Sequence, residues 1–546
     1  MVSLWYHKEV LSMKSKSRIL LISTIIIFIL TIFIGTSYSL WQTINTQKDN
    51  NAVTTSCFDI EFSDGNNINI ENAYPISDDK GLQKVPYSLK LKNNCELGSS
   101  FKIVVNPLKS NTLDNQFIKL AIKENDNLKF TPKAINELQV NNEYDTSKYS
   151  SSYTILEDNL YSKQEKEYKI YLWMNIDATN SEMNKIFKAN FMIINTVNSD
   201  IVSLDKKILD NNGGKEYIEN KGNPDFSRAS VTQAYYDKLE DKTDYTVDTG
   251  MYSTEDDYGT SYYFRGAVDN NNVIFANFCW QIIRITGNNS IRLIYNGIPD
   301  NGTCPKVYGS NSGISNGIFN NSNDNAYVGY MYGNVGSDNY NDTHANLNSS
   351  NAKNKVDIWF ENNLKEYQSL LTDTLFCGDR SIADKEGYWA GDDTAKGYGK
   401  EVTYYGAYAR SNFSNNSELK NKPTLKCLNK NDRYTVNDNN TGNASLTYPV
   451  ALINADEIAM AGGLGNVDNK GFYLYTDAYT VSMSASYFFA SKPRVIFINR
   501  TGSFSIGSQT FTNNGSFILR PVINLTPYIQ TTGNGTINDP FVVKTE

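Results

Sequence analysis

Histidine is nearly absent from this sequence of 546 residues, which contains only His7 and His344. A serine or cysteine nucleophile usually needs a neighbouring histidine to take its proton, and we expect no serine elbow of the kind that hydrolases use. The interpretation as an extracellular enzyme, a hydrolase or an oxidase, therefore rests on Cys377 or His344. Because neither residue is part of a convincing catalytic constellation, we expect the protein not to be an enzyme.

Basic clusters and closely spaced cysteine pairs are missing as well. Outside the extreme N-terminus Lys and Arg do not gather in a patch, and the formal net charge is −8 with a pI near 5.2. Nucleic acids are bound through Lys and Arg clusters, so this composition argues against a nucleic-acid partner. The six cysteines include no Cys-x-x-Cys spacing, which argues against a zinc site or a redox motif. We therefore expect no metal and no cofactor.

The chain opens with a basic segment, residues 1–18, in which Met13 is a second candidate for the start of translation. Residues 19–36, ILLISTIIIFILTIFIGT, carry no charge and are just long enough to span a bilayer. The basic flank favours a cytoplasmic N-terminus, so a single pass would leave the bulk of the chain outside the cell. The small triplet at 37–39 also fits a signal peptidase. Two alternatives stay open: an uncleaved membrane anchor, or a signal peptide cut after Ser39 that yields a secreted or cell-surface protein.

Residues 41–199 alternate apolar and polar residues in short runs, separated by turns rich in Asn, Asp, Gly and Ser. A period of two is typical of antiparallel strands with one buried face. The clearest runs are 88–92, 101–106, 168–175 and 187–195. Several such strands with little helix favour a β-sandwich.

Residues 200–250 are expected to be a connector, because their short helical pattern is interrupted by glycines and a proline. Docking of this connector on the following domain stays open. Residues 251–546 then predict an α+β domain. Its strand signals lie at 272–285, 290–297, 494–506 and 516–525. One helix is predicted within 349–373, where apolar residues recur three and four apart, and a shorter one at 454–462. The whole chain is thus predicted to be mainly β, with an N-terminal transmembrane or signal helix, an antiparallel sandwich and an α+β domain.

The cysteines are even in number, as expected for a disulfide framework outside the cell. Six cysteines allow 15 connectivities, and the sequence alone does not choose rigorously among them. Proximity within each expected domain favours three pairs. These are Cys57 with Cys95, Cys279 with Cys304, and Cys377 with Cys427.

Several strings resemble, in content and in order, an uncharacterised family of surface proteins from Gram-positive, often gut-dwelling bacteria (Firmicutes). They lie at 256–297, 326–333, 343–364, 376–381, 453–463, 479–486 and 519–525. The match covers roughly residues 200 to 545, and it implies a domain distantly similar to C-type lectins and to the formylglycine-generating enzyme. The strings at 55–95 are similar to exported β-sandwich modules of the biofilm-fibre and camelysin kind.

The chain departs from these patterns at informative places. It lacks the Glu-Pro-Asn and Trp-Asn-Asp strings of the lectin calcium site, so the resemblance does not imply calcium-dependent sugar binding. The cysteines are expected to be structural, whereas the generating enzyme needs a reactive pair. Gln281 stands after the hairpin tryptophan, where the family is expected to carry a basic residue, and Arg520 is expected to be partly buried beside a carboxylate.

A candidate binding site combines the strings GDRS and YWAGDD. An aromatic ring beside carboxylates and a guanidinium is what a sugar or peptide pocket uses. The alternative is an Asp–Arg pair that only fixes a loop beside a disulfide. The residues concerned are Asp379, Arg380, Trp389, Asp392 and Asp393.

The favoured hypothesis is an exported, non-enzymatic cell-surface protein, an adhesin or ligand-binding module on a β-sandwich stalk. Its partners would be the membrane, through residues 19–36 if these are not removed, and a host or matrix glycan or protein. The alternative is a subunit of an extracellular fibre or biofilm matrix, released by cleavage after Ser39 and assembled by strand exchange.

Overall fold

The structure is a computed structural model of the chain. It describes residues 42–46, 53–55, 57–62, 67–71, 73–231, 248–321, 323–383, 403–411, 417–489, 492–508 and 517–545. Two compact units are present, Met1–Val202 and Ser203–Glu546, and each is described by itself. No helix within the described ranges is long and apolar enough to cross a membrane. The predicted span at 19–36 and the cleavage position after Ser39 lie outside those ranges.

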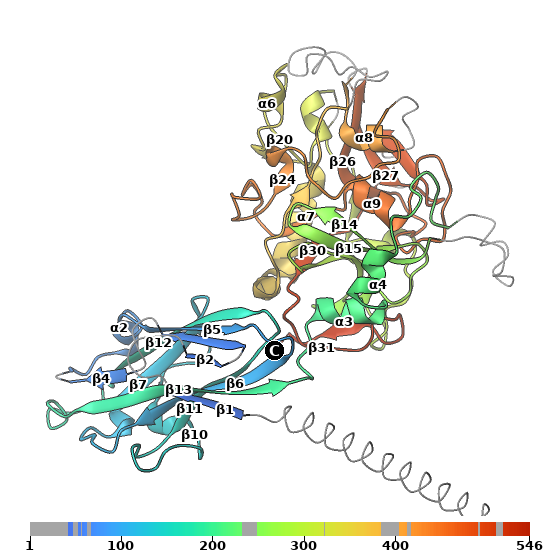
Figure 1. Ribbon diagram of the computed structural model, residues 1–546. Coiled ribbons are helices and arrows are strands. Elements are labelled where there is room, and N and C mark those ends of the chain that lie inside the picture. The colour runs from blue at the N-terminus through green and yellow to red at the C-terminus, as the bar shows by residue number, and fades with distance from the viewer. Residues whose placement is uncertain are drawn as a thin grey trace, which may run out of the picture. The chain divides into compact units, whose positions relative to one another are not determined.

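The first unit contains two antiparallel sheets that lie face to face (Figure 1). One sheet has the order β1 (Gln42–Thr46), β13 (Phe187–Asn198), β6 (Gly98–Pro107), β11 (Tyr153–Leu160) and β10 (Gln139–Val140), with β4 (Asn67–Ile70) also on β13. The other has the order β2 (Val53–Thr55), β3 (Phe58–Phe62), β5 (Tyr87–Asn93), β12 (Glu165–Met174), β7 (Ile118–Glu124) and β8 (Asn127–Leu128), with β9 (Lys133–Ala134) also on β7.

The hydrophobic core of the first unit lies between these sheets. In β5, for example, Leu89 and Leu91 are fully buried while Lys90 and Lys92 are exposed, because successive side chains leave opposite faces of a strand. The core residues come from both sheets and include Phe58, Ile60, Leu120, Ile122, Ile170, Phe101, Ile103, Val105, Phe187, Phe191 and Ile193. The predicted antiparallel strands are therefore confirmed.

Short helices complete the first unit. They are α2 (Asp78–Gly81) and the 3₁₀ turns η1 (Asn115–Phe117) and η2 (Ile135–Glu137). Gly81 contacts the indole of Trp173, and a Cβ atom at this position would lie 2.2 Å from that ring. The helix thus packs closely against the outer face of β12, over a small apolar cluster that Trp173 shares with Tyr171 and Ala121.

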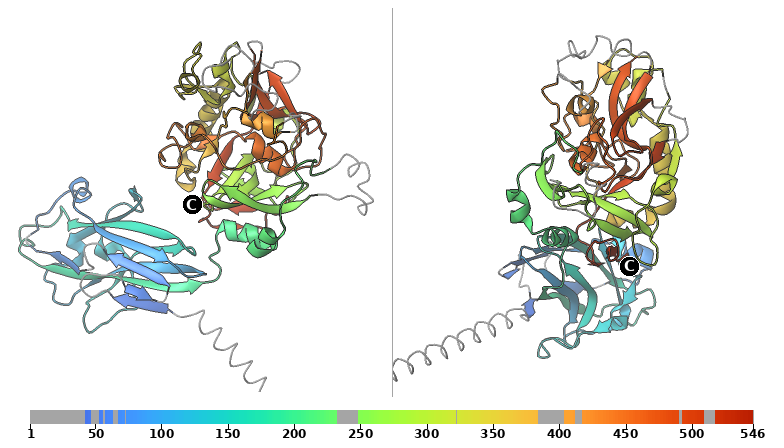
Figure 2. Two further views of the ribbon diagram at one scale, coloured as in Figure 1. Left: turned by 45° about the horizontal axis from the view of Figure 1, so that its top comes forward. Right: turned by 90° about the vertical axis from the view of Figure 1, so that its right-hand side faces the viewer.

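The second unit contains two larger sheets, and Figure 2 shows it from two further sides. The nine-stranded sheet has the order β25 (Val450–Ala451), β30 (Val522–Leu525), β18 (Ile291–Tyr295), β17 (Phe278–Ile285), β16 (Asn272–Phe275), β32 (Phe541–Val543) and β31 (Thr531–Thr532), with β15 (Gly259–Arg265) on β17 and β14 (Gly250–Asp256) on β15. The six-stranded sheet has the order β19 (Ser315–Gly317), β29 (Phe517–Leu519), β26 (Thr480–Phe489), β27 (Lys492–Ile498) and β28 (Phe504–Ser508), with β23 (Thr403–Tyr404) on β26. Two small ladders pair β20 (Met331–Tyr332) with β21 (Asn348–Ser349) and β22 (Phe376–Cys377) with β24 (Arg433–Tyr434).

The helices of the second unit are short. They are α3 (Leu204–Asn211), α4 (Lys215–Asn220), α6 (Tyr340–Thr343), α7 (Asn351–Asn363), α8 (Gly406–Arg410) and α9 (Ala455–Ala461), with 3₁₀ turns η3 (Gly309–Ser312), η4 (Asn325–Val328), η5 (Lys365–Leu370) and η6 (Lys430–Asp432). The helix predicted within 349–373 begins as expected, because the Ser350 hydroxyl caps it by accepting the Lys353 N–H at 3.1 Å. It ends earlier than its apolar pattern, since the backbone leaves the α conformation at the buried Leu364 and continues as η5.

Residues 203–231 and 248–250 belong to the second unit, whereas residues 200–202 belong to the first. The predicted connector therefore packs on the domain that follows it. Leu204 and Ile208 of α3 and Ile218 of α4 are at most 1 % exposed and join the main core of that unit. These apolar residues belong to the short helical pattern of the sequence, and the glycines separate the two helices that it forms.

Candidate functional site

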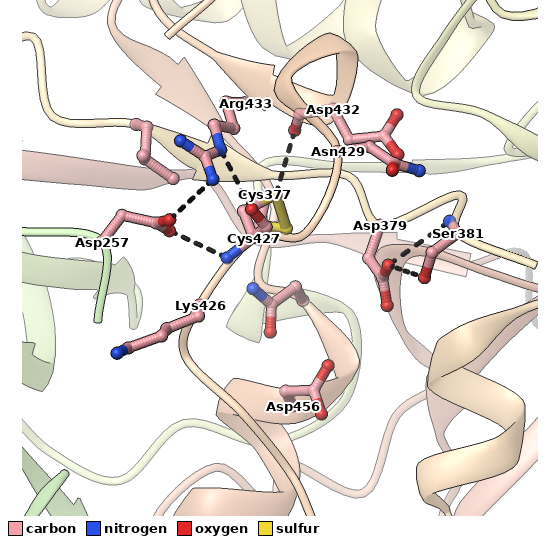
Figure 3. The surroundings of a disulfide bond; sticks show 12 residues. Asp257, Cys377, Asp379, Ser381, Lys426, Cys427, Asn429, Asp432, Arg433 and Asp456 are labelled. Carbon is pink, nitrogen blue, oxygen red and sulfur yellow. Dashed lines mark hydrogen bonds and ion pairs between the residues drawn. A yellow bond between two sulfur atoms is a disulfide. The ribbon is translucent and has the colours of Figure 1, made fainter. Parts of the chain in front are cut away.

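The candidate site lies where the chain turns after strand β22. The antiparallel pairing of β22 with β24 brings Cys377 opposite Arg433. A disulfide joins Cys377 to Cys427, and both residues are buried. Figure 3 shows this bond between the two segments that it ties together. We call residues 376–381 and 427–433 the disulfide corner.

All six cysteines are paired in the same way as proximity in the sequence predicted. The other two bonds join Cys57 to Cys95 in the first unit and Cys279 to Cys304 in the second. The sulfur of Cys377 is therefore not available as a thiolate, which the enzyme interpretation required of it.

Asp257, from the turn between β14 and β15, fastens one side of the corner. Its Oδ2 accepts the backbone N–H of Cys427 at 2.8 Å, and its Oδ1 lies 3.1 Å from the Arg433 guanidinium. Arg433 Nε in turn donates to the Cys427 carbonyl at 2.9 Å. These contacts are drawn in Figure 3 and hold the strand after the disulfide against the β14–β15 hairpin.

Arg380 is a structural tie within the corner. Its side chain is fully buried, with Nε donating to Asp432 Oδ1 at 2.6 Å and the backbone N–H donating to Asp432 Oδ2 at 2.7 Å. The terminal nitrogens donate to the Met331 carbonyl at 2.8 Å and to Asn346 Oδ1 at 2.9 Å. Because the guanidinium is enclosed by these acceptors, it is not presented to a ligand.

Asp379 is also buried and has a backbone φ of +41°, which is uncommon for a residue other than glycine. Its Oδ1 accepts the Ser381 hydroxyl at 2.6 Å, and its Oδ2 accepts a hydrogen bond from Arg410 of α8. Asp379 and Arg380 therefore do not pair with each other, and each binds a partner from elsewhere in the chain.

Arg410 joins Asp379 to a second carboxylate, Asp456 in the first turn of α9. Its Nε and one terminal nitrogen donate to the two oxygens of Asp456 at 2.8 and 2.6 Å. One buried guanidinium thus forms ion pairs with two carboxylates. Burial raises the pKa of the Asp456 carboxyl, and Asp379 acts in the same direction, although Arg410 opposes both. We call Asp379, Arg410 and Asp456 the carboxylate–arginine triad.

The neighbouring residue of α9, Glu457, begins a second buried network. Its Oε1 accepts hydrogen bonds from Arg292 at 2.6 Å and from Arg284 at 3.1 Å, and Arg284 also donates to Asp256 at 2.6 Å. Burial acts to raise the pKa of Glu457, but Arg292 and Arg284 outweigh it and hold the pKa below its ordinary value. Asn454 and Glu457 also form the capping box of α9. One short helix therefore anchors both networks.

The predicted site is only partly described. Asp379 and Arg380 lie in the corner, whereas Trp389, Asp392 and Asp393 lie outside the described residues. The described ends of that stretch are close together, since the Ala383 N–H donates to the Tyr404 carbonyl at 2.9 Å.

The sequence prediction missed the partners that make the corner rigid, namely Arg410, Asp432 and Asp456. They are 31, 52 and 46 positions from the residues that they bind. The one local signal was the spacing of Asn454 and Glu457, which predicts the start of α9 but not the arginines that meet it.

Arg520 departs from its prediction. It is 1 % exposed, but among the described residues it binds no carboxylate. Its four acceptors are the carbonyl oxygens of Tyr295 and Leu474 and the amide oxygens of Gln281 and Asn296, at 2.8 to 3.2 Å. Burial lowers the pKa of Arg520 to about 10. Gln281 therefore has a structural role, as a neutral partner of a buried cation.

The remaining catalytic candidates are not assembled into a site. The letters Gly-x-Ser-x-Gly do occur at 313–317, contrary to the expectation from the sequence, but Ser315 begins strand β19 and its hydroxyl donates to the Asn316 carbonyl. His344 is buried against Tyr340, with ring centroids 4.6 Å apart. No group of His, Cys, Asp or Glu in the described ranges is arranged to hold a metal ion.

Comparisons with known proteins give no identification: no protein-family model matches the chain, and neither does any curated protein. The resemblance to Gram-positive surface proteins therefore stays a prediction.

Replacing Arg410 tests whether the triad stabilises the second unit. We expect Arg410→Met to lower the free energy of unfolding at pH 7 by about 3–5 kcal/mol, because two buried carboxylates lose their counter-charge. The loss should shrink in acid, where the carboxylates take up protons. Urea unfolding followed by tryptophan fluorescence measures the change. Lys206→Met is the matched control, since Lys206 pairs with Asp210 on the surface at 2.9 Å and should cost less than about 1 kcal/mol. An equal loss in the free energy of unfolding for Arg410→Met and Lys206→Met would contradict the role of the triad.

The lowered pKa of His344 predicts that acid destabilises the fold, whereas the raised pKa of Asp456 acts in the opposite direction. Burial, together with Arg380, lowers the pKa of His344 well below its ordinary value. Below the pKa of about 6.5 that histidine has in the unfolded chain, the unfolded chain binds a proton that the folded chain does not. The free energy of unfolding therefore falls by up to ~1.4 kcal/mol for each unit by which the pH is lowered. The variant His344→Gln should lose this slope between pH 6.5 and 5. Parallel pH profiles of unfolding for the two proteins would refute the assignment.

Proposed function

We propose that this chain is an exported cell-surface protein that binds a host or matrix ligand through its second unit. The observation that carries the proposal is the disulfide corner, in which one disulfide and buried ion pairs fix several irregular segments. Binding residues are commonly displayed on loops that a rigid scaffold positions. The corner is held rigid by several buried ion pairs, and in the sequence it adjoins a stretch rich in aromatic and acidic residues. This arrangement fits the display of a binding loop on a rigid scaffold.

Two further observations support export and a binding role. Three disulfides are expected in an oxidising, extracellular compartment rather than in the cytosol. The mixed sheets and short helices of the second unit are consistent with a lectin-like α+β module, which we propose on the sequence resemblance. The disulfide bond of Cys377 and the buried position of His344 favour binding over catalysis. Residues 19–36 would supply the membrane anchor if they are not removed.

Binding by the full chain to arrays of glycans, mucins and matrix proteins tests this proposal. Wild-type protein should bind at least one class of ligand. The double variant Cys377→Ser with Cys427→Ser should bind about tenfold more weakly or worse, because the corner loses its covalent tie. The matched control is Cys57→Ser with Cys95→Ser, which removes a disulfide of the first unit and should leave affinity unchanged. A wild-type chain that binds no ligand on the arrays would refute the proposal.

A second candidate function is a subunit of an extracellular fibre or matrix, and the position of strand β1 favours it. β1 begins at Gln42, three residues after the predicted cleavage point, and is the edge strand next to β13. Its register sets Ile44 opposite Ile194. An edge strand at a newly made N-terminus can be supplied by another copy of the chain, which gives assembly by strand exchange.

The fibre hypothesis requires a mature chain that begins at Leu40 and forms high-mass assemblies. N-terminal sequencing and size-exclusion chromatography measure both. Ile44→Pro should abolish the assemblies, because proline removes a backbone donor from the β1–β13 ladder. Ile44→Val should assemble as the wild type does. Recovery of full-length monomer alone, in membranes, would exclude this candidate.

A further inference from the structure

Three tyrosines gather at one edge of the six-stranded sheet. Tyr404 on β23 lies directly opposite Tyr487 on β26, and their ring centroids are 5.4 Å apart. The ring of Tyr408, on α8, lies 4.9 Å from that of Tyr404 and 5.7 Å from that of Tyr487. All three side chains are partly exposed. We call these residues the tyrosine cluster.

The backbone beneath the cluster is held by groups already described. Tyr408 lies two residues before Arg410, which binds Asp379 and Asp456. Tyr404 receives the N–H of Ala383 at its carbonyl oxygen. Two of the three rings therefore stand on elements whose position is set by the carboxylate–arginine triad and its surroundings, as a preorganised binding surface requires.

Positive charge adjoins the rings. The guanidinium of Arg494, on β27, lies 5.8 Å from the ring centroid of Tyr487. Its Nε atom is buried and has no hydrogen-bond acceptor in the part of the chain that the structure describes. Lys492, two residues earlier and therefore on the same face of the strand, is exposed. Arg494 as a whole is only half-buried, so this part of the sheet carries two cations beside the partly exposed rings.

We propose that the tyrosine cluster with Arg494 and Lys492 binds an acidic carbohydrate, a glycan that carries carboxylate or sulfate groups. The inference rests on the proposed binding function and names a surface and a ligand class for it. Sugar rings pack their C–H faces on aromatic rings, and their hydroxyls are met by the phenolic groups at the ring edges. The anionic group is met by the Arg494 guanidinium, which favours carboxylates and sulfates through paired N–H donors.

A carbohydrate fits this surface better than a protein partner. A stable protein interface buries roughly 800 Å² on each side around a well-packed apolar centre. The cluster instead offers three amphipathic rings, each with a hydroxyl, beside two cations. The two cations favour anionic ligands by charge.

The test is the affinity of the full chain for a glycan array that contains carboxylated, sulfated and neutral members. We expect Tyr487→Ala and Tyr408→Ala each to weaken binding of acidic glycans about tenfold. Arg494→Gln should weaken acidic glycans by a similar factor and leave neutral ones within about twofold. The conservative variant Tyr487→Phe should retain most of the affinity. Unfolding transitions equal to that of the wild type check that each variant folds.

Tyr308→Ala is the matched control, because Tyr308 is 49 % exposed and has Lys306 over its ring at 5.7 Å. It should leave binding unchanged. Acidic glycan binding that all cluster variants retain would overturn this surface while leaving the proposed function in place. Binding of proteins or peptides alone would overturn the ligand class. A wild-type chain without any ligand would overturn both the inference and the proposed function.

Discussion

The second unit depends on one guanidinium that two carboxylates share. Arg410 lies at the end of α8, Asp379 follows β22 and Asp456 lies in the first turn of α9, so a single side chain fixes the mutual position of three segments. Burying these charges is expensive, and removing one partner exposes the others to the full cost. The arrangement is therefore strict: each segment has one position at which its charge is satisfied.

Buried ion pairs are weak contributors to net stability but strong constraints on geometry, and this unit uses them where aliphatic side chains are scarce. Residues 308–350 are rich in Asn, Gly, Ser and Tyr and supply few large apolar groups. Arg380 reaches into this region and binds Met331 and Asn346, which ties a polar loop to the corner. Directional bonds thus replace much of the packing that orders loops in a more apolar protein.

The sequence predicted the features that depend on residues close together in the chain. The alternation in β5, the cap at Ser350 and the three cysteine pairs depend on neighbours within a few dozen residues, and the sequence displays them. The sequence did not predict the ion pairs, because any of several acidic residues was as plausible a partner for Arg380 as Asp432. Arg520 shows the same limit in reverse: a buried arginine predicts a carboxylate, yet backbone and amide oxygens meet it here. The function remains the least accessible level, since no single residue identifies a ligand.

The disulfide between Cys377 and Cys427 closes a loop of the chain around the stretch with Trp389, Asp392 and Asp393. A protease that cuts once anywhere between the two cysteines leaves the pieces covalently joined. The ion pairs of Asp379 with Arg410 and of Asp432 with Arg380 would still hold the segments on either side of the disulfide. The two sides of the corner therefore stay connected after a single cut in the loop between them.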